Sequence, residues 1–239
     1  MIRNLKTYGL VLVAVGAIGA VTASAASAVV TPFWFKSDGD WTKYVGAQVK
    51  IGGVGDQFTT DAGAISCETT TYAGSSSATT VSSIELTPTY SDCTPVIGFS
   101  TVTTNGCSYL LKADNDTGGD PVKYDVETEI KCPPGKDITV DVYTNSSETT
   151  RICTIHIPPQ NTGTGTTLTN TGTGTITADI GIPSVITYTQ TSGGSEGTGL
   201  TKCTNFGSTV TSNGSYKGHA IIEGKNTSNA ETNIELSTS

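Results

Sequence analysis

One serine stands in a pattern that is used for nucleophilic catalysis. Ser195 lies in the run Gly193-Gly194-Ser195-Glu196-Gly197, which matches the Gly-x-Ser-x-Gly turn of many hydrolases. That turn works because a helix follows it and helps to form the oxyanion hole. No helical pattern follows Ser195, and glycine, serine and threonine surround it. The run therefore favours an ordinary loop, and an extracellular hydrolase is a remote alternative.

Two histidines and two glutamates are the other groups with acid–base chemistry. His156 and His219 have no evident nucleophile or orienting acid, so they do not indicate a catalytic triad. Glu127 and Glu129 share one face of an expected strand at about 6.6–7 Å, a separation of interest for a glycosidase. Lysines at positions 123 and 131 flank them on that face, which favours a solvated charged surface. We expect no catalytic residue and predict that the protein is not an enzyme.

An acidic loop is the candidate metal site. Asp114, Asp116 and Asp120 lie in a run of aspartate, asparagine and glycine whose oxygens suit calcium. The run departs from the EF-hand pattern, because Gly118 occupies a ligand position and no glutamate closes the loop. The same residue types are the usual turn formers. The three aspartates are a weak calcium candidate, and we expect no cofactor.

The aromatic residues gather near the start of the chain. Trp34, Trp41 and Tyr44, beside Phe33 and Phe35, offer flat faces on which a sugar ring can stack. The alternative, which we favour, is that these rings close one end of a hydrophobic core. A carbohydrate-binding module is therefore the second functional hypothesis.

The six cysteines indicate disulfide bonds. An even number in an exported chain predicts three bridges, and no Cys-x-x-Cys pair supports a zinc site. Pairing of chain neighbours would join Cys132 to Cys153, but a flat meander would hold them about 15 Å apart, beyond the ~7 Å that a bridge spans. The connectivity therefore stays open among Cys67, Cys93, Cys107, Cys132, Cys153 and Cys203.

The first 28 residues have the layout of a secretory signal peptide. Arg3 and Lys6 precede an apolar stretch at 8–21, and Ala-Ser-Ala sites follow at 23–25 and 26–28. The apolar stretch is shorter than the ~18–20 residues that span a membrane. We expect cleavage after Ala25 or Ala28, no membrane span afterwards, and a secreted or cell-surface product. The net charge of −8, with no run of lysine or arginine, excludes a nucleic-acid partner.

The stretch from Val122 to Cys132 alternates apolar and charged residues with period two, which predicts a strand with one buried face. Short strands of this kind, separated by turn residues such as Asn105-Gly106, recur along the chain and no helical period appears. The pattern is typical of an antiparallel sandwich or barrel. We expect a disulfide-braced β-sandwich, immunoglobulin-like or jelly-roll-like, that follows an N-terminal signal helix.

We expect a signal peptide at 1–28 and a single all-β domain at 29–239, with an aromatic N-terminal arm at 29–42. Residues 161–175 contain the hexapeptide Asn-Thr-Gly-Thr-Gly-Thr twice. We interpret them as a surface excursion; an interdomain linker, or two polar turns around Leu168, are the alternatives.

Four runs carry a resemblance to a known group of proteins. They are LTPTYSDC at 86–93, NGCSY at 105–109, CPPGK at 132–136 and CTIHIPPQ at 153–160. With them the chain resembles a family of uncharacterised secreted bacterial proteins, rich in threonine and glycine, that contain cysteines. The resemblance implies an exported all-β protein and brings no assigned activity. The absence of a convergent catalytic set, together with alternating strands and exported cysteines, favours a non-enzymatic structural or interaction module of unknown partner, for which a cell-surface glycan or protein is the candidate.

Overall fold

The structure is a computed structural model that describes residues 32–238, apart from 40–41, 52, 54, 62, 97, 119–121, 172–173 and 193–209. In these ranges every regular element is a β-strand, and the strands pair antiparallel. The all-β prediction is confirmed. The expected signal peptide lies outside the described residues. Within the described part, no helix is long and apolar enough to cross a membrane.

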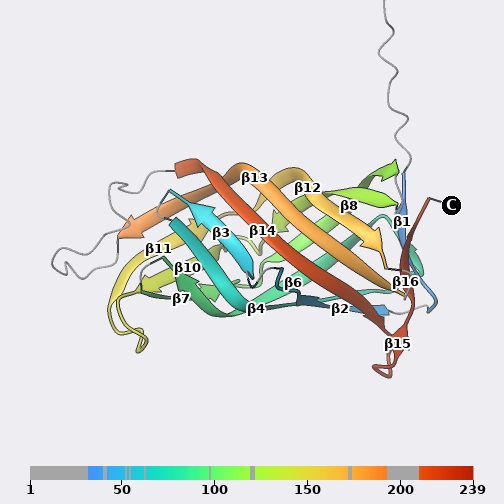
Figure 1. Cartoon of the computed structure of the whole chain (residues 1–239), viewed down its shortest axis with the longest axis horizontal. Coiled ribbons are helices and arrows are strands. Elements are labelled where there is room, and N and C mark those ends of the chain that lie inside the picture. Colours follow the sequence, from blue (N-terminus) through green and yellow to red (C-terminus); the bar gives the residue numbers. More distant parts are fainter. Residues whose placement is uncertain are drawn as a thin grey trace, which may run out of the picture.

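Sixteen strands make up the described part (Figure 1). Their bounds are Trp34–Ser37 (β1), Thr42–Gln48 (β2), Asp56–Thr60 (β3), Gly63–Ser76 (β4), Thr80–Val81 (β5), Ser83–Pro95 (β6), Phe99–Thr103 (β7), Ser108–Gly118 (β8), Lys123–Lys131 (β9), Ile138–Tyr143 (β10), Arg151–Ile157 (β11), Gln160–Asn170 (β12), Thr175–Ser192 (β13), Val210–Lys225 (β14), Glu231–Thr232 (β15) and Ile234–Ser237 (β16).

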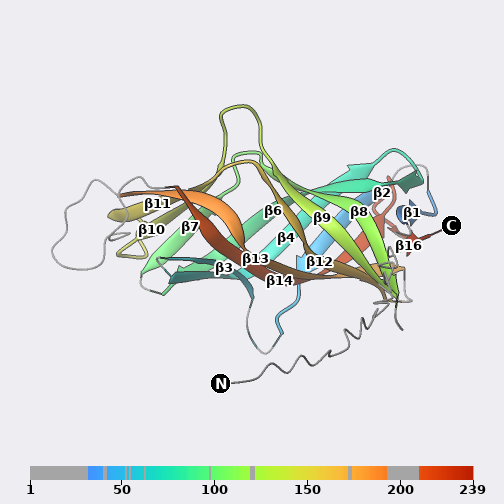
Figure 2. The same cartoon turned by 90° about the horizontal axis from the view of Figure 1, so that it is seen from above.

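Thirteen of these strands form one sheet that closes on itself. The order β6-β8-β9-β12-β13-β14-β2-β4 returns to β6, because β4 also pairs with β6. A second circuit, β6-β7-β10-β11-β13-β14-β3-β4, closes in the same way. The sheet is therefore a closed tube (Figure 2). The two separately bonded sheets expected of a sandwich are not confirmed.

The tube has eight strand positions around its circumference, and each of these positions is called a place here. Four are filled by the long strands β4, β6, β13 and β14, which belong to both circuits. Each of the other four holds two shorter strands in succession: β2 with β3, β7 with β8, β9 with β10, and β11 with β12. Taken in chain order, the eight places form an up-and-down meander. The proline and glycine turns of the sequence lie at the breaks within it.

The turn at Asn105-Gly106 forms but does not make the predicted hairpin. Both residues have positive φ, 53° and 81°, and the Cys107 amide donates to the Thr104 carbonyl at 2.8 Å. The strands on either side, β7 and β8, both pair with β6 and not with each other. The turn therefore joins two successive strands that occupy the same strand position of the tube.

Residues 160–170 are not the surface excursion that we expected. They form β12, which pairs with β9 on one side and β13 on the other. Leu168 is 0% exposed, and Thr162 and Thr166 are buried beside it. Threonine is β-branched and suits a half-buried pleated surface, so the polar repeat builds a strand inside the sheet.

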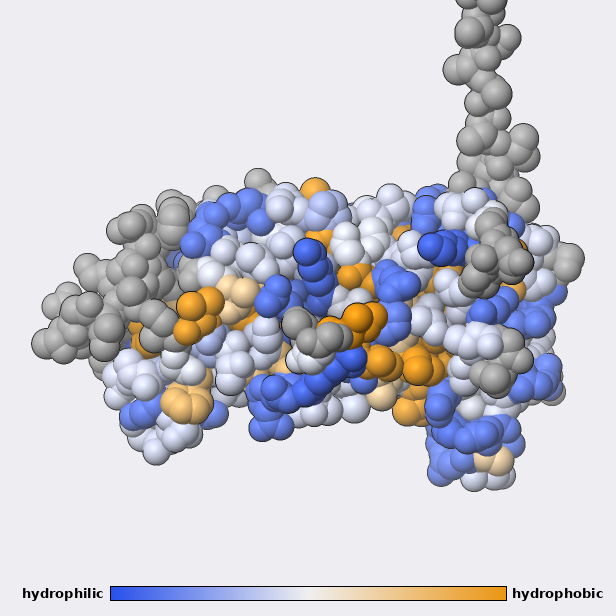
Figure 3. Space-filling model, viewed as in Figure 1, coloured by the Kyte–Doolittle hydropathy of each residue, from blue (hydrophilic) through white to orange (hydrophobic). Residues whose placement is uncertain are grey.

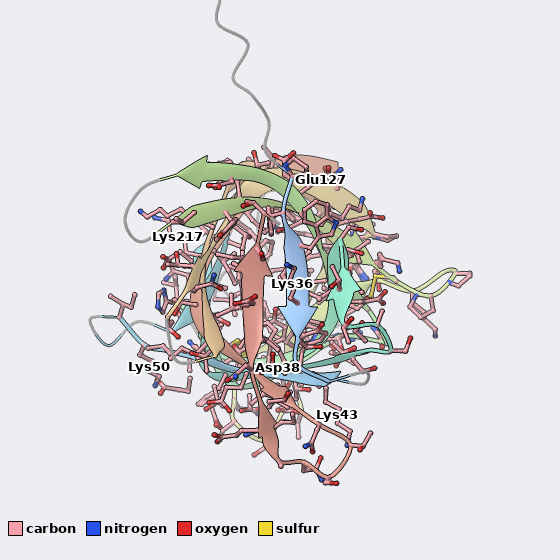
Figure 4. All side chains as sticks on the ribbon, turned by 90° about the vertical axis from the view of Figure 1, so that its right-hand side faces the viewer. Lys36, Asp38, Lys43, Lys50, Glu127 and Lys217 are labelled. Atoms are coloured by element: carbon pink, nitrogen blue, oxygen red, sulfur yellow. A yellow bond between two sulfur atoms is a disulfide. The ribbon has the colours of Figure 1, made fainter. Side chains whose placement is uncertain are left out.

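A small second sheet covers one end of the tube. Its order is β16-β1-β5, and it lies across the opening when the molecule is viewed along the tube (Figure 4). The inward-facing side chains of this sheet, among them Phe35 and Leu236, join the core cluster of that half of the tube. Phe33 packs against Tyr124 with ring centroids 4.9 Å apart. The expected closure of the core by aromatic residues is confirmed for Phe33, Phe35 and Tyr44, each at most 2% exposed.

Side-chain alternation places the core as the sequence indicates. In β9, Tyr124, Val126 and Ile130 are buried, and the lysines and carboxylates between them face outward. One buried cluster fills the half of the tube near the small sheet, and a second fills the other half. On the outer surface, hydrophobic residues such as Val45 and Ile51 are interspersed with hydrophilic ones (Figure 3).

Two disulfides brace neighbouring places of the tube. Cys67–Cys93 joins β4 to β6, and Cys107–Cys132 joins the start of β8 to the end of β9. Pairing of Cys132 with Cys153 is therefore wrong, in line with the distance argument. Cys153 is also disulfide-bonded, and Cys203 lies outside the described residues. The bridges indicate an oxidising environment.

Candidate functional site

A cavity of about 80 Å³ lies inside the tube, where the two core clusters meet. Leu86, Ala220 and Ile222 of one cluster and Phe58 and Ile186 of the other belong to its wall. Closed sheets of eight strands enclose an interior that side chains just fill or that holds one small ligand. This interior is not completely filled, and its wall is largely apolar.

One carboxylate and four phenols form a polar group in this wall, the tyrosine–aspartate cluster (Asp56, Tyr72, Tyr90, Tyr109 and Tyr216). The Tyr72 hydroxyl donates to Asp56 Oδ2 at 2.8 Å, and the Tyr72 and Tyr216 hydroxyl oxygens are 3.3 Å apart. The Tyr90 and Tyr109 hydroxyls are 2.6 Å apart, and Tyr90 also interacts with Tyr216. Hydrogen bonds thus link Asp56, Tyr72 and Tyr216, and a separate bond joins Tyr90 to Tyr109 in the same wall.

Five different strands position these side chains. Asp56 is the first residue of β3, where the inward positions are Asp56, Phe58 and Thr60. The tyrosines come from β4, β6, β8 and β14, which meet around the tube only after the sheet has closed. The closed sheet therefore brings together residues that are up to 160 positions apart in the chain, as Asp56 and Tyr216 show.

Burial raises the pKa of all four tyrosines in the cluster. Desolvation is the largest cause in each, and it acts with Asp56 to raise the pKa of Tyr109 to about 12. The pKa values of Tyr72, Tyr90 and Tyr216 lie well above the usual value of 10.0. Tyr90 and Tyr109 keep some accessible surface, and both line the cavity. The phenols are therefore neutral hydrogen-bonding groups at neutral pH.

The second oxygen of Asp56 has no hydrogen-bond partner. Asp56 is 2% exposed, and its Oδ1 is buried without a donor. A Cβ atom on Gly218 would lie 2.4 Å from this oxygen, so the glycine leaves the room that the carboxylate occupies. Among the described residues that line the cavity there is no lysine, arginine or histidine. A buried carboxylate without a cationic partner is unfavourable, so this group is a candidate for ligand recognition.

The outer carboxylates do not form an acid–base pair. Lys112 Nζ lies 3.3 Å from Glu127 Oε1 and 2.6 Å from Glu129 Oε2, on the outside of the tube. Lys131 binds Glu85 at 2.7 Å on the same surface. The glutamates therefore belong to a half-exposed charged network, and the structure supports the solvated-surface interpretation.

Each histidine has a carboxylate partner that the sequence did not reveal. His156 Nδ1 lies 2.9 Å from Asp137 Oδ2, and His219 Nδ1 contacts Asp179 Oδ1. Both pairs lie away from the cavity wall. Ser195, the candidate nucleophile of the sequence, lies outside the described residues.

The aspartates of the calcium candidate do not converge in the described part of the chain. Asp114 and Asp116 lie on β8, which continues to Gly118, and Asp116 Oδ1 accepts a hydrogen bond from the Gly118 amide at 2.7 Å. Asp120 lies outside the described residues. Among the residues described, no group of three or more histidine, cysteine, aspartate or glutamate side chains could hold a metal ion.

The aromatic platform loses one of its three members. Tyr44 is 2% exposed and belongs to the core, so its ring is not available to a glycan at the surface. Trp34 is half-buried on β1, and Trp41 lies outside the described residues. The burial follows from alternation in β2, where Tyr44 and Gly46 face inward and Val45 faces outward.

We expect glycans to leave the tryptophan emission of the protein unchanged, because Tyr44, the third ring of the predicted platform, is buried in the core. A fluorescence titration against a panel of soluble glycans measures this. A saturable shift in emission that the Trp34→Ala substitution abolishes would restore the carbohydrate-binding hypothesis.

Sequence reasoning missed the tyrosine–aspartate cluster. The only local signal is the two-residue spacing of Asp56, Phe58 and Thr60, which would place all three on the same face of a strand. This signal is weak, because an aspartate that follows glycine is usually a turn residue.

Comparison with models of protein families, with curated proteins and with solved structures finds no match to this chain.

Proposed function

We propose that this protein is an exported, non-enzymatic binding protein that takes up a small, largely apolar molecule in the cavity of its closed sheet. The observation that carries the proposal is the cavity itself, with the unpaired Asp56 carboxylate in an otherwise apolar wall. A well-packed interior leaves few voids larger than a water molecule, so a cavity of about 80 Å³ is a departure that a ligand would explain.

The chemistry of the wall favours binding over catalysis. The lining holds no histidine, lysine or arginine, and its cysteine, Cys67, is disulfide-bonded. Export is supported by the signal-peptide pattern at 1–28 and by the disulfides, which suit an oxidising compartment. The resemblance to secreted bacterial proteins agrees with this location.

Xenon is expected to bind in the cavity of the native protein, because small apolar cavities take up xenon. The Ala220→Leu substitution should abolish this binding, since Ala220 is 2% exposed and its side chain lines the cavity. Filling a cavity also raises the free energy of unfolding by about 0.5–2 kcal/mol. Xenon nuclear magnetic resonance and chemical denaturation measure the two effects.

The matched control is Ala73→Leu, which adds the same three carbons on the exposed outer face of β4. It should leave xenon binding unchanged. Failure of the native protein to bind xenon, or equal binding by Ala220→Leu, would contradict the proposed function.

A further inference from the structure

We infer that the ligand of this cavity carries a protonated amine that binds the carboxylate of Asp56. The inference rests on the proposed function and specifies the chemistry of the ligand.

The hydroxyl hydrogens next to Asp56 are already used in hydrogen bonds within the cluster. Tyr72 donates its only hydroxyl hydrogen to Asp56 Oδ2, so Tyr216 must be the donor in the contact between Tyr216 and Tyr72. The Tyr90–Tyr109 pair has two hydroxyl hydrogens, and one of them serves the bond between these two residues. The two hydroxyl hydrogens next to Asp56, those of Tyr72 and Tyr216, are thus both used, and Asp56 Oδ1 remains an acceptor without a donor. A ligand that binds here must supply the donor.

The spare donor of the wall lies elsewhere. The Thr128 and Thr166 hydroxyls bond each other at 3.1 Å, which leaves one hydrogen free. These threonines are on β9 and β12, across the ring from β3. On its own side of the cavity, Asp56 accepts one hydrogen bond, from Tyr72, and its Oδ1 accepts none.

Charge favours an ammonium over a neutral donor. Asp56 is the one acidic residue of the lining, and no basic residue there offsets its charge. A small cation would form a charge-assisted hydrogen bond with the carboxylate and would meet the faces of the neighbouring tyrosine rings. The apolar remainder of the ligand would contact residues such as Leu86 and Ile222.

The Asp56 carboxylate can rotate to bind a ligand in the cavity. The torsion about the Cβ–Cγ bond of aspartate is broad and twofold, so either oxygen can turn toward the cavity. A Cβ atom on Gly218 would lie 2.4 Å from Oδ1, so the glycine leaves the space beside this oxygen open.

Three probes of matched size test the inference on the full exported chain: n-propylammonium, 1-propanol and n-butane. The native protein should bind n-propylammonium, and Asp56→Asn should weaken that binding about tenfold to a hundredfold, the usual range for a hydrogen bond to a charged group. Binding of n-butane should change by less than about threefold, since it makes no charge-assisted bond. Titration calorimetry and saturation of ligand resonances give the affinities.

Asp179→Asn is the matched control, because it removes a carboxylate of the outer surface that is 61% exposed. It should leave all three affinities unchanged. A measurement on the native protein keeps the test independent of the folding of Asp56→Asn: nuclear Overhauser contacts should join the propylammonium protons to the Tyr72 and Tyr216 rings.

The outcomes separate the two proposals. Binding of n-butane and 1-propanol without n-propylammonium, or n-propylammonium affinity that Asp56→Asn leaves intact, overturns the amine assignment and leaves the proposed function standing. Failure of all three probes and of xenon overturns both.

Discussion

Raising the pH from 10 to 12 is expected to unfold this protein within a narrow range. In the unfolded chain tyrosine ionises near pH 10, whereas desolvation raises the pKa of Tyr72, Tyr90, Tyr109 and Tyr216 in the folded protein, that of Tyr109 to about 12. Above pH 10 the unfolded state therefore releases protons that the folded state keeps. The stability is fully present below pH 10 and is lost as the pH rises toward the folded pKa values.

The size of this effect follows from the number of groups. Each tyrosine lowers the free energy of unfolding by at most about 1.4 kcal/mol per pH unit, so four together reach about 5 kcal/mol per unit. A domain has about 5–15 kcal/mol in total. Chemical denaturation at a series of alkaline pH values measures the slope, and tyrosinate absorbance follows the ionisation directly.

The control for this prediction is Tyr90→Phe, which removes one titrating group and should reduce the slope by about a quarter. The absorbance should rise in one cooperative step for the four tyrosines of the cluster. A gradual rise centred near pH 10 for all nine tyrosines of the chain, with the fold intact, would contradict the burial of the cluster.

Replacement of Cys107 and Cys132 by alanine is expected to lower the free energy of unfolding by about 3–4 kcal/mol. The bridge closes a loop of 25 residues and so restricts the unfolded chain. In the chain-entropy model, loss of the bridge raises the conformational entropy of the unfolded chain, which lowers the free energy of unfolding by that amount. For a chain of this size the melting temperature should fall by about 6–16 °C. Differential scanning calorimetry under non-reducing conditions measures the shift.

The second bridge provides a matched comparison. Cys67–Cys93 closes a loop of 26 residues, so the chain-entropy model predicts nearly the same loss for Cys67→Ala with Cys93→Ala. A larger loss for the Cys107–Cys132 pair would show that packing adds to it, because Cys107 is 0% exposed. An unchanged melting curve after full reduction would mean that the thiols are not bridged.

The local structure could be predicted because its signals are short-range. The alternation from 123 to 131 gives both the strand and its buried face, and Asn105-Gly106 gives a turn with positive φ at both residues. The distance argument against a Cys132–Cys153 bridge also held, because strand rise limits where two cysteines can meet.

The closure of the sheet could not be predicted in the same way. A period-two pattern fixes which face of a strand is buried but not which strands become neighbours. The corner at Asn105-Gly106 has the sequence of a hairpin, yet β7 and β8 continue along the same edge of β6. Residues 160–170 are polar in composition and still supply Leu168 to the core.

The candidate site depends on that closure, which explains why sequence reasoning missed it. Asp56 and the tyrosines at 72, 90, 109 and 216 lie on five strands, and each alone is an ordinary inward-facing residue of an alternating run. The aromatic residues near the start of the chain gave a stronger compositional signal. In the structure, Tyr44 among them contributes to the core instead.

The closing pairs of this molecule join the two extremes of the described chain. β2 pairs with β14, and β1 pairs with β16 so that Trp34 lies opposite Ser237. Contacts of such long sequence separation make assembly slow, since the intervening chain must be ordered before they can form. The edges of β1 and β2 therefore stay unpaired until β14 and β16 have been synthesised and have reached them. A molecule truncated before β14 would remain an open sheet prone to self-association.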